Sequence, residues 1–121
     1  MAKHNDVGNL GEQIAQKHLI DKKYCILAKG WRWGKGEIDI ICQQADCLVF
    51  VEVKTLSNNV FGFPEQNVSP KKQQLMYQLA TEYMYQQNYE QEFRFDIIAI
   101  TLHPQLSIRH FEDAFFPNWN D

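Results

Sequence analysis

The chain has 121 residues, of which 45% are hydrophobic, so it is long and apolar enough to form one self-sufficient domain over residues 1–121. Its formal net charge of −3 argues against a generic nucleic-acid-binding protein, so any DNA contact must come from a local basic patch. The cysteines and histidines are too scattered for a zinc site, no apolar run could cross a bilayer, and the N-terminus lacks a signal peptide, so a cytoplasmic protein without a membrane partner is expected.

The first predicted element is an amphipathic helix. Apolar residues recur at helical spacing over residues 7–21, and Asp6 is a candidate N-cap. Glu12 lies at the edge of the apolar stripe, so its carboxylate can face a cleft rather than bulk water.

Three strands are predicted next, over residues 24–33, 37–43 and 47–55. Gly34 and Gly36 break the chain after the first of them, and a short polar turn joins the other two. Strands joined this closely are expected to pair as antiparallel hairpins.

A second helix is predicted after a loop over residues 56–67. Ser69 and Pro70 form a strong helix start, with serine as the N-cap and proline as the first helical residue. The apolar periodicity that follows predicts a helix that ends near Gln87.

The chain is expected to finish with two strands. Residues 93–101 form an apolar strand of the buried type, and residues 106–111 a weaker edge strand, whereas residues 115–121 have no predicted structure. A crossover through the second helix can place strand 93–101 parallel to strand 47–55. The expectation is an α/β fold in the order α-β-β-β-α-β-β, with a mixed sheet of about five strands flanked by helices.

The charged residues on the central strands are the candidate site. Glu52 and Lys54 are two positions apart, so they point to the same face of their strand. An even loop centred on residues 45–46 would place Asp39 opposite Glu52, with their Cβ atoms roughly 4.5–5.5 Å apart. An odd loop would place Asp39 opposite Val51 and separate the two carboxylates.

Two carboxylates this close repel each other unless a cation lies between them. Mg²⁺ or Mn²⁺ would fit Asp39 and Glu52, because hard cations take one or two carboxylates and keep several waters. Lys54 could stabilise the charge that develops on a phosphate, and Glu12 could reach the metal directly or through water. The competing interpretation is a structural ion-pair network, with Glu12 as an ordinary surface charge.

Two groups of basic residues are candidates for nucleic-acid contacts. Arg32 and Lys35 are interleaved with Trp31, which suits backbone contact and base stacking, although the tryptophan can equally belong to the core. Lys71 and Lys72 fall in the first turn of the second helix, where a cation opposes the helix dipole and a bound anion would explain it.

These motifs together resemble a known group of enzymes. Glu12, the Gly36–Ile41 segment GEIDII and the Val49–Thr55 segment VFVEVKT are similar to the PD-(D/E)xK nuclease superfamily, with its restriction-endonuclease-like fold. More narrowly, they resemble the YraN-type bacterial family, which is related to Holliday-junction resolvases. Two positions depart from the pattern, because Ile38 stands in place of the superfamily's proline and Leu56 where many relatives carry arginine.

The resemblance implies roles for the matching residues. Asp39 and Glu52 would bind the metal, Lys54 would be the catalytic lysine and Glu12 an auxiliary acid. The implied function is a Mg²⁺- or Mn²⁺-dependent DNA endonuclease that acts on branched or damaged DNA, and the symmetric substrates of such enzymes make a homodimer plausible. The alternative is a non-catalytic nucleic-acid-binding or protein-interaction module that retains the nuclease fold.

Overall fold

The computed structural model describes residues 3–56 and 68–117 of the chain. Its elements follow the predicted order α-β-β-β-α-β-β, and the predicted α/β fold with a five-stranded mixed sheet is confirmed. The elements are α1 (Lys3–Asp21), β1 (Cys25–Trp33), β2 (Gly36–Gln44), β3 (Cys47–Leu56), α2 (Pro70–Gln86), β4 (Phe93–Thr101) and β5 (Ser107–Phe115).

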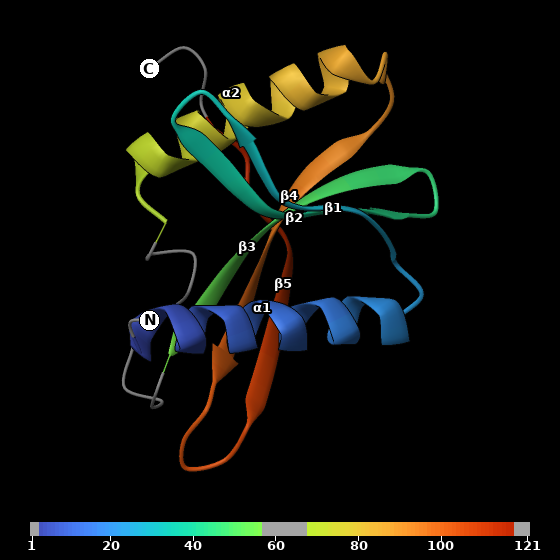
Figure 1. Cartoon of the computed structure of the whole chain (residues 1–121). Coiled ribbons are helices and arrows are strands. Elements are labelled where there is room, and N and C mark those ends of the chain that lie inside the picture. The colour runs from blue at the N-terminus through green and yellow to red at the C-terminus, as the bar shows by residue number, and fades with distance from the viewer. Residues whose placement is uncertain (1–2, 57–67, 118–121) are drawn as a thin grey trace.

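The strands lie in the sheet in chain order, from β1 at one edge to β5 at the other. Neighbouring strands are antiparallel except β3 and β4, which run parallel because α2 carries the chain back between them. The two helices cover opposite faces of this sheet (Figure 1). Strand β3 therefore lies at the centre of the sheet, with a helix on each side.

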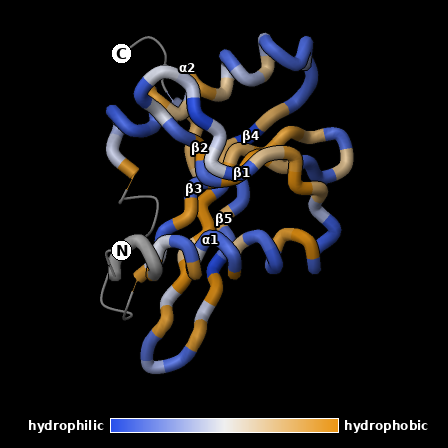
Figure 2. The backbone as a smooth tube through the Cα atoms, viewed as in Figure 1, coloured by the Kyte–Doolittle hydropathy of each residue, from blue (hydrophilic) through white to orange (hydrophobic). Residues whose placement is uncertain are grey.

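Each face of the sheet carries its own hydrophobic core. Under α1, Ala15 and Leu19 pack against Val51 and its neighbours on β3 and β4. Under α2, Met76 and Phe50 belong to the second cluster. The central strands accordingly carry the most hydrophobic colours along the backbone, as Figure 2 shows. Within residues 3–56 and 68–117, no helix has the length and apolarity needed to cross a membrane.

Several element boundaries differ from the predictions. Helix α1 begins at Lys3, so Asp6 lies inside the helix and its predicted role as N-cap is wrong. Gly36 begins β2 instead of separating the strands. A Cβ at this position would lie 2.7 Å from Leu79 Cδ1 of α2, so a larger residue would require this leucine to shift. Strand β5 is longer than predicted and reaches Phe115, which pairs with Phe95 of β4.

The start of the second helix was predicted correctly. The Ser69 side chain accepts a hydrogen bond of 3.1 Å from the Lys72 amide, and Pro70 is the first helical residue. Most of the predicted loop (residues 57–67) and the last residues of the tail (118–121) lie outside the described residues.

Helix α1 crosses β3 at very short range through a glycine. A Cβ built on Gly11 would lie 1.8 Å from Thr55 Oγ1, so no side chain fits between the helix and the strand. This contact fixes the neighbouring residue of the helix, Glu12, close to the carboxyl end of β3. The glycine is thus needed for close packing, although it has a low helix propensity.

We expect Gly11→Ala to lower the free energy of unfolding by about 1–3 kcal/mol, because overpacking forces helix and strand apart. Gly8→Ala is the matched control on the same helix, since nothing lies within 4 Å of its added Cβ. That control should gain up to about 1 kcal/mol from the better helix propensity of alanine. Urea denaturation of both variants checks this prediction, and similar stability changes in the two would contradict it.

Candidate active site

The register of the β2–β3 hairpin is the even one that the site requires. Gln44 pairs with Cys47 across the turn, and Ile40 pairs with Val51 at the other end of the ladder. Asp39 and Glu52 are the next residues beyond that last pair. The hairpin therefore brings the two acidic residues together, and the alternative in which Asp39 faces Val51 is excluded.

The two strands separate at Asp39. In this register the Val53 amide would donate to the carbonyl of Ile38, but it donates instead to Asp39 Oδ2 over 2.8 Å. The alternation of β2 is interrupted at the same place, because Ile38 packs under α2 whereas Ile40 packs under α1. The Asp39 carboxylate thus takes over a hydrogen bond of the sheet at the point where the ladder opens.

Glu52 is the most buried acid of the site, with 6% of its surface exposed. Lys54, on the same face of β3 as predicted, places its Nζ 3.6 Å from Glu52 Oε2. Lys72, in the first turn of α2, places its Nζ 3.5 Å from the same oxygen. Charge pairing of this kind is what makes a buried carboxylate tolerable.

Two acids of the site, Asp39 and Glu12, have raised pKa values, and burial is the largest cause in each. Burial, followed by repulsion from Glu52, raises the pKa of Asp39 to about 7, and the hydrogen bond from Val53 offsets only part of this. Burial also raises the pKa of Glu12, with further contributions from Glu37 and Glu52. The electrostatic effect of Glu12 on Asp39 is evidence that α1 contributes an acid to the same site.

The donor set matches a hard divalent cation better than an enclosed zinc ion. In the described part of the chain, no three His, Cys, Asp or Glu side chains are grouped tightly enough to hold a metal by themselves. Mg²⁺ and Mn²⁺ need fewer protein ligands, because they keep several waters. Asp39 and Glu52 suit such an ion, since a cation would relieve the repulsion that raises the pKa of Asp39.

The basic residues predicted to bind nucleic acid come from two parts of the fold, the β1–β2 hairpin and the start of α2. Arg32 of β1 pairs with Glu37 of β2 over 3.0 Å, and Lys35 lies exposed in the turn between these strands. Lys72 contacts Glu52, whereas its neighbour Lys71 is exposed. The sequence pointed to a lysine at the start of α2, but the pairing of Lys72 with Glu52 depends on the crossover and was missed.

Trp31 is partly buried and packs against the hydrophobic core under α2. Its ring packs edge-on against Tyr83 of α2, with centroids 5.4 Å apart. Trp33 is half exposed. The core interpretation left open in the sequence therefore holds for Trp31.

Comparison with known proteins finds relatives that match almost the whole chain. A sequence model described as "Uncharacterised protein family UPF0102" matches residues 11–100, a range that contains the four catalytic candidates Glu12, Asp39, Glu52 and Lys54. A UPF0102 protein of Flavobacterium psychrophilum is 45% identical over 117 residues, covering 96% of this chain and 98% of its own length. UPF0102 proteins of Flavobacterium johnsoniae and Thermodesulfovibrio yellowstonii are each 40% identical, covering 96% and 92% of this chain and 98% and 96% of their own lengths. None of these names states an activity.

The raised pKa of Asp39 predicts that the stability of the protein decreases as the pH rises. The folded-state pKa of about 7 exceeds the ordinary value of 3.8, so stability decreases as pH rises from about 4 to about 7 and stays low above it. Asp39→Asn keeps an oxygen for the Val53 amide but never ionises. We expect Asp39→Asn to raise the free energy of unfolding by about 2 kcal/mol at pH 8. The full pKa shift, at roughly 1.4 kcal/mol per unit, would give more, but solvent screens the charge of a partly exposed side chain.

The gain should fall to less than half of this value at pH 5, where the folded wild-type protein holds the proton. Chemical denaturation of the metal-free protein at both pH values measures the difference. Asp46→Asn, at the exposed turn of the same hairpin, is the matched control. A stabilisation by Asp39→Asn that is equal at pH 5 and pH 8 would contradict the pKa assignment.

Proposed function

The chain belongs to the uncharacterised protein family UPF0102, in the restriction-endonuclease-like superfamily, and we propose that it is a divalent-metal-dependent DNA endonuclease. The observation that carries this proposal is the position of Asp39 and Glu52, two acids held together on the central strands with a lysine beside them. Acids with raised pKa values and a specific charge partner are more common at functional sites than elsewhere.

Each residue of the site has a chemical role in phosphodiester hydrolysis. Asp39 and Glu52 would hold Mg²⁺ or Mn²⁺, which when bound polarises a phosphate and lowers the pKa of a water. Lys54 lies within 3.6 Å of Glu52, so its ammonium group is placed to stabilise the negative charge that develops on the phosphate oxygens. Glu12, on α1, would orient water at the metal or accept its proton.

The basic residues around the site define where DNA would lie. Lys72 reaches the site from α2, and exposed Lys71 extends the positive surface beyond it. Arg32 and Lys35 add positive charge from the β1–β2 hairpin. Backbone phosphates held between these two groups would pass over the acids, which reconciles a DNA substrate with the net charge of −3. Branched or damaged DNA is the substrate class that the resolvase resemblance favours.

A non-catalytic nucleic-acid-binding module is the second candidate. It is favoured by the pairing of Glu52 with two lysines, which already compensates the buried charge without a metal. Such a module would bind DNA equally well with or without Mn²⁺, and Asp39→Asn would not change its affinity.

The endonuclease proposal predicts a metal-dependent loss of activity in two variants. Purified protein should nick or cut branched DNA in the presence of Mn²⁺, and Asp39→Ala or Lys54→Ala should each reduce the rate by about 100-fold or more. Asp46→Ala is the matched control, because this exposed aspartate lies on the same hairpin away from the site. Gel assays on plasmid and four-way-junction substrates measure the rates, and equal activity in all four proteins would exclude the mechanism.

Lys72 provides a test of the metal site that does not depend on cleavage. Lys72→Met removes a cation from Glu52, so Mn²⁺ should bind about 3–10-fold more tightly while DNA affinity falls. Lys71→Met removes the neighbouring exposed lysine and should leave Mn²⁺ affinity unchanged. Calorimetric titration with Mn²⁺ distinguishes them, and an equal Mn²⁺ affinity in the two variants would remove Lys72 from the site.

A further inference from the structure

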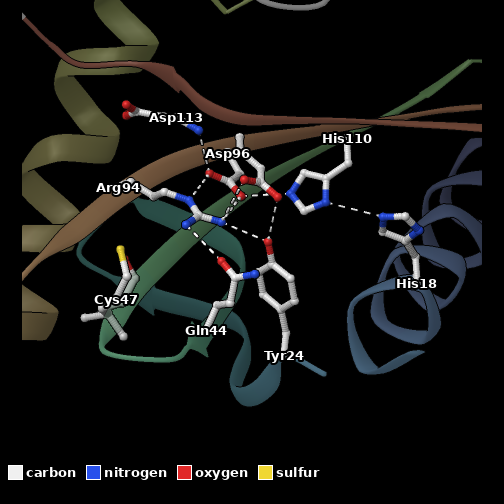
Figure 3. A network of polar contacts seen from close by, with 10 residues as sticks. His18, Tyr24, Gln44, Cys47, Arg94, Asp96, His110 and Asp113 are labelled. Carbon is white, nitrogen blue, oxygen red and sulfur yellow. Dashed lines mark hydrogen bonds and ion pairs between the residues drawn. The ribbon is translucent and has the colours of Figure 1, made fainter. Parts of the chain in front are cut away.

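A second buried polar network lies under α1, and the endonuclease site makes no use of it. Its centre is Asp96 of β4, which is fully buried. Asp96 accepts hydrogen bonds of 2.9 Å from Arg94 Nε and from the Asp113 amide, and it lies 2.8 Å from His110 Nε2 (Figure 3). His110 in turn places its Nδ1 3.3 Å from Nε2 of His18 on α1. Three elements thus contribute to one hydrogen-bonded relay, Asp96–His110–His18.

When both imidazoles are neutral, these contacts assign the protons of the two rings. Burial would raise the pKa of Asp96, but hydrogen bonds from His110 and Arg94 hold that pKa below its usual value, so Asp96 is an ionised acceptor. His110 therefore donates through Nε2, and its Nδ1 can accept from His18 Nε2. This leaves His18 Nδ1 as the open basic atom of the relay, for which the described residues supply no hydrogen-bond partner.

His18 lies in the wall of a groove of about 570 Å³ between α1 and the β4–β5 hairpin. One end of the groove is apolar, with Leu10 and Ile14 of α1 facing Leu106 and Ile108 of the hairpin. Leu10 and Leu106 are 45% and 55% exposed, so this end is open to a ligand.

The other end of the groove is basic. Lys17 is paired with Asp21 over 3.2 Å, but Lys22 makes no ion pair within the described residues and lies next to His18. Leu10 precedes His18 by eight residues, which is roughly 12 Å along a helix. The groove therefore changes from apolar to cationic over about the length of a medium alkyl chain.

We propose that this groove binds a small amphipathic carboxylate, such as a medium-chain fatty acid. The alkyl chain lies against Leu10, Ile14 and Leu106, and the carboxylate lies between His18 Nδ1 and Lys22. The groove volume falls within the range of small-molecule sites, and its charge is complementary to an anionic head with an apolar tail.

The relay makes this binding depend on pH. Burial, His110 and Lys22 lower the pKa of His18, and Asp21 offsets part of the shift, so the empty groove favours neutral His18 near pH 7. A bound carboxylate favours the protonated ring, which then donates through Nδ1 to the ligand and through Nε2 to His110, with Asp96 behind it. Carboxylate binding therefore takes up a proton at His18.

Titration of the metal-free full chain with decanoate tests the proposal. Decanoate should bind saturably and at least about threefold more tightly at pH 6 than at pH 8, whereas decyltrimethylammonium should bind at least about tenfold more weakly than decanoate at pH 6. His18→Gln should abolish the pH dependence. Leu106→Ser should weaken decanoate binding about tenfold, because it removes apolar contact area. Its matched control, Leu27→Ser, changes a leucine outside the groove that is 44% exposed, against 55% for Leu106.

Three outcomes would overturn the proposal. The first is the absence of saturable binding at millimolar decanoate, and the second is an equal loss of affinity in Leu106→Ser and Leu27→Ser. The third is a dimer, seen by light scattering, that Leu106→Ser dissociates, since the occupant would then be a second copy of the chain. Asp39→Ala should bind decanoate like the wild type, so this result is independent of the proposed nuclease activity.

Discussion

The hydrogen bond from the Val53 amide to the Asp39 carboxylate is the interaction on which the candidate site depends. A continued ladder would give that amide to the carbonyl of Ile38, and the Asp39 carboxylate would then have no bond to the backbone of β3. The substitution of a side-chain oxygen for a backbone oxygen opens the hairpin without leaving an amide unsatisfied. It also holds an acidic side chain next to Glu52 at the centre of the sheet, where a carboxylate without a specific partner would be strongly destabilising.

The surrounding elements supply charge from both faces of the sheet. Lys54 and Lys72 compensate Glu52, the first from β3 and the second from α2. Glu12 adds negative charge from α1, whose position follows from the absence of a side chain on Gly11. The negative charges near Asp39 are only partly compensated by lysines. This repulsion lowers the stability of the folded protein, and the proposed metal ion would relieve it. Such a cost is common at functional sites.

Two aspartates of the sheet, the buried Asp96 and the partly buried Asp39, show how the partners of a carboxylate decide whether it stays ionised. Asp96 receives hydrogen bonds from Arg94, His110 and the Asp113 amide, and its pKa is lowered. Asp39 receives one amide and faces another carboxylate, and its pKa is raised to about 7. Burial acts in the same direction on both, so the difference comes from their partners. Asp96 serves as a fixed anion that orients His110, whereas Asp39 would exchange its proton for the cation of the proposed metal site.

The sequence by itself determined the order of elements, the cap at Ser69 and the shared face of Glu52 and Lys54. It reduced the pairing of Asp39 with Glu52 to the parity of one loop, which the structure shows to be even. These features follow from local rules, because strand alternation, helix caps and two-residue turns depend on neighbours in the chain. Only the tertiary structure decided the break in alternation at Asp39, the contact of Lys72 with Glu52, and the relay from Asp96 to His18. Each of these joins residues of different elements, and their distances are set by how two helices pack on opposite faces of a twisted sheet.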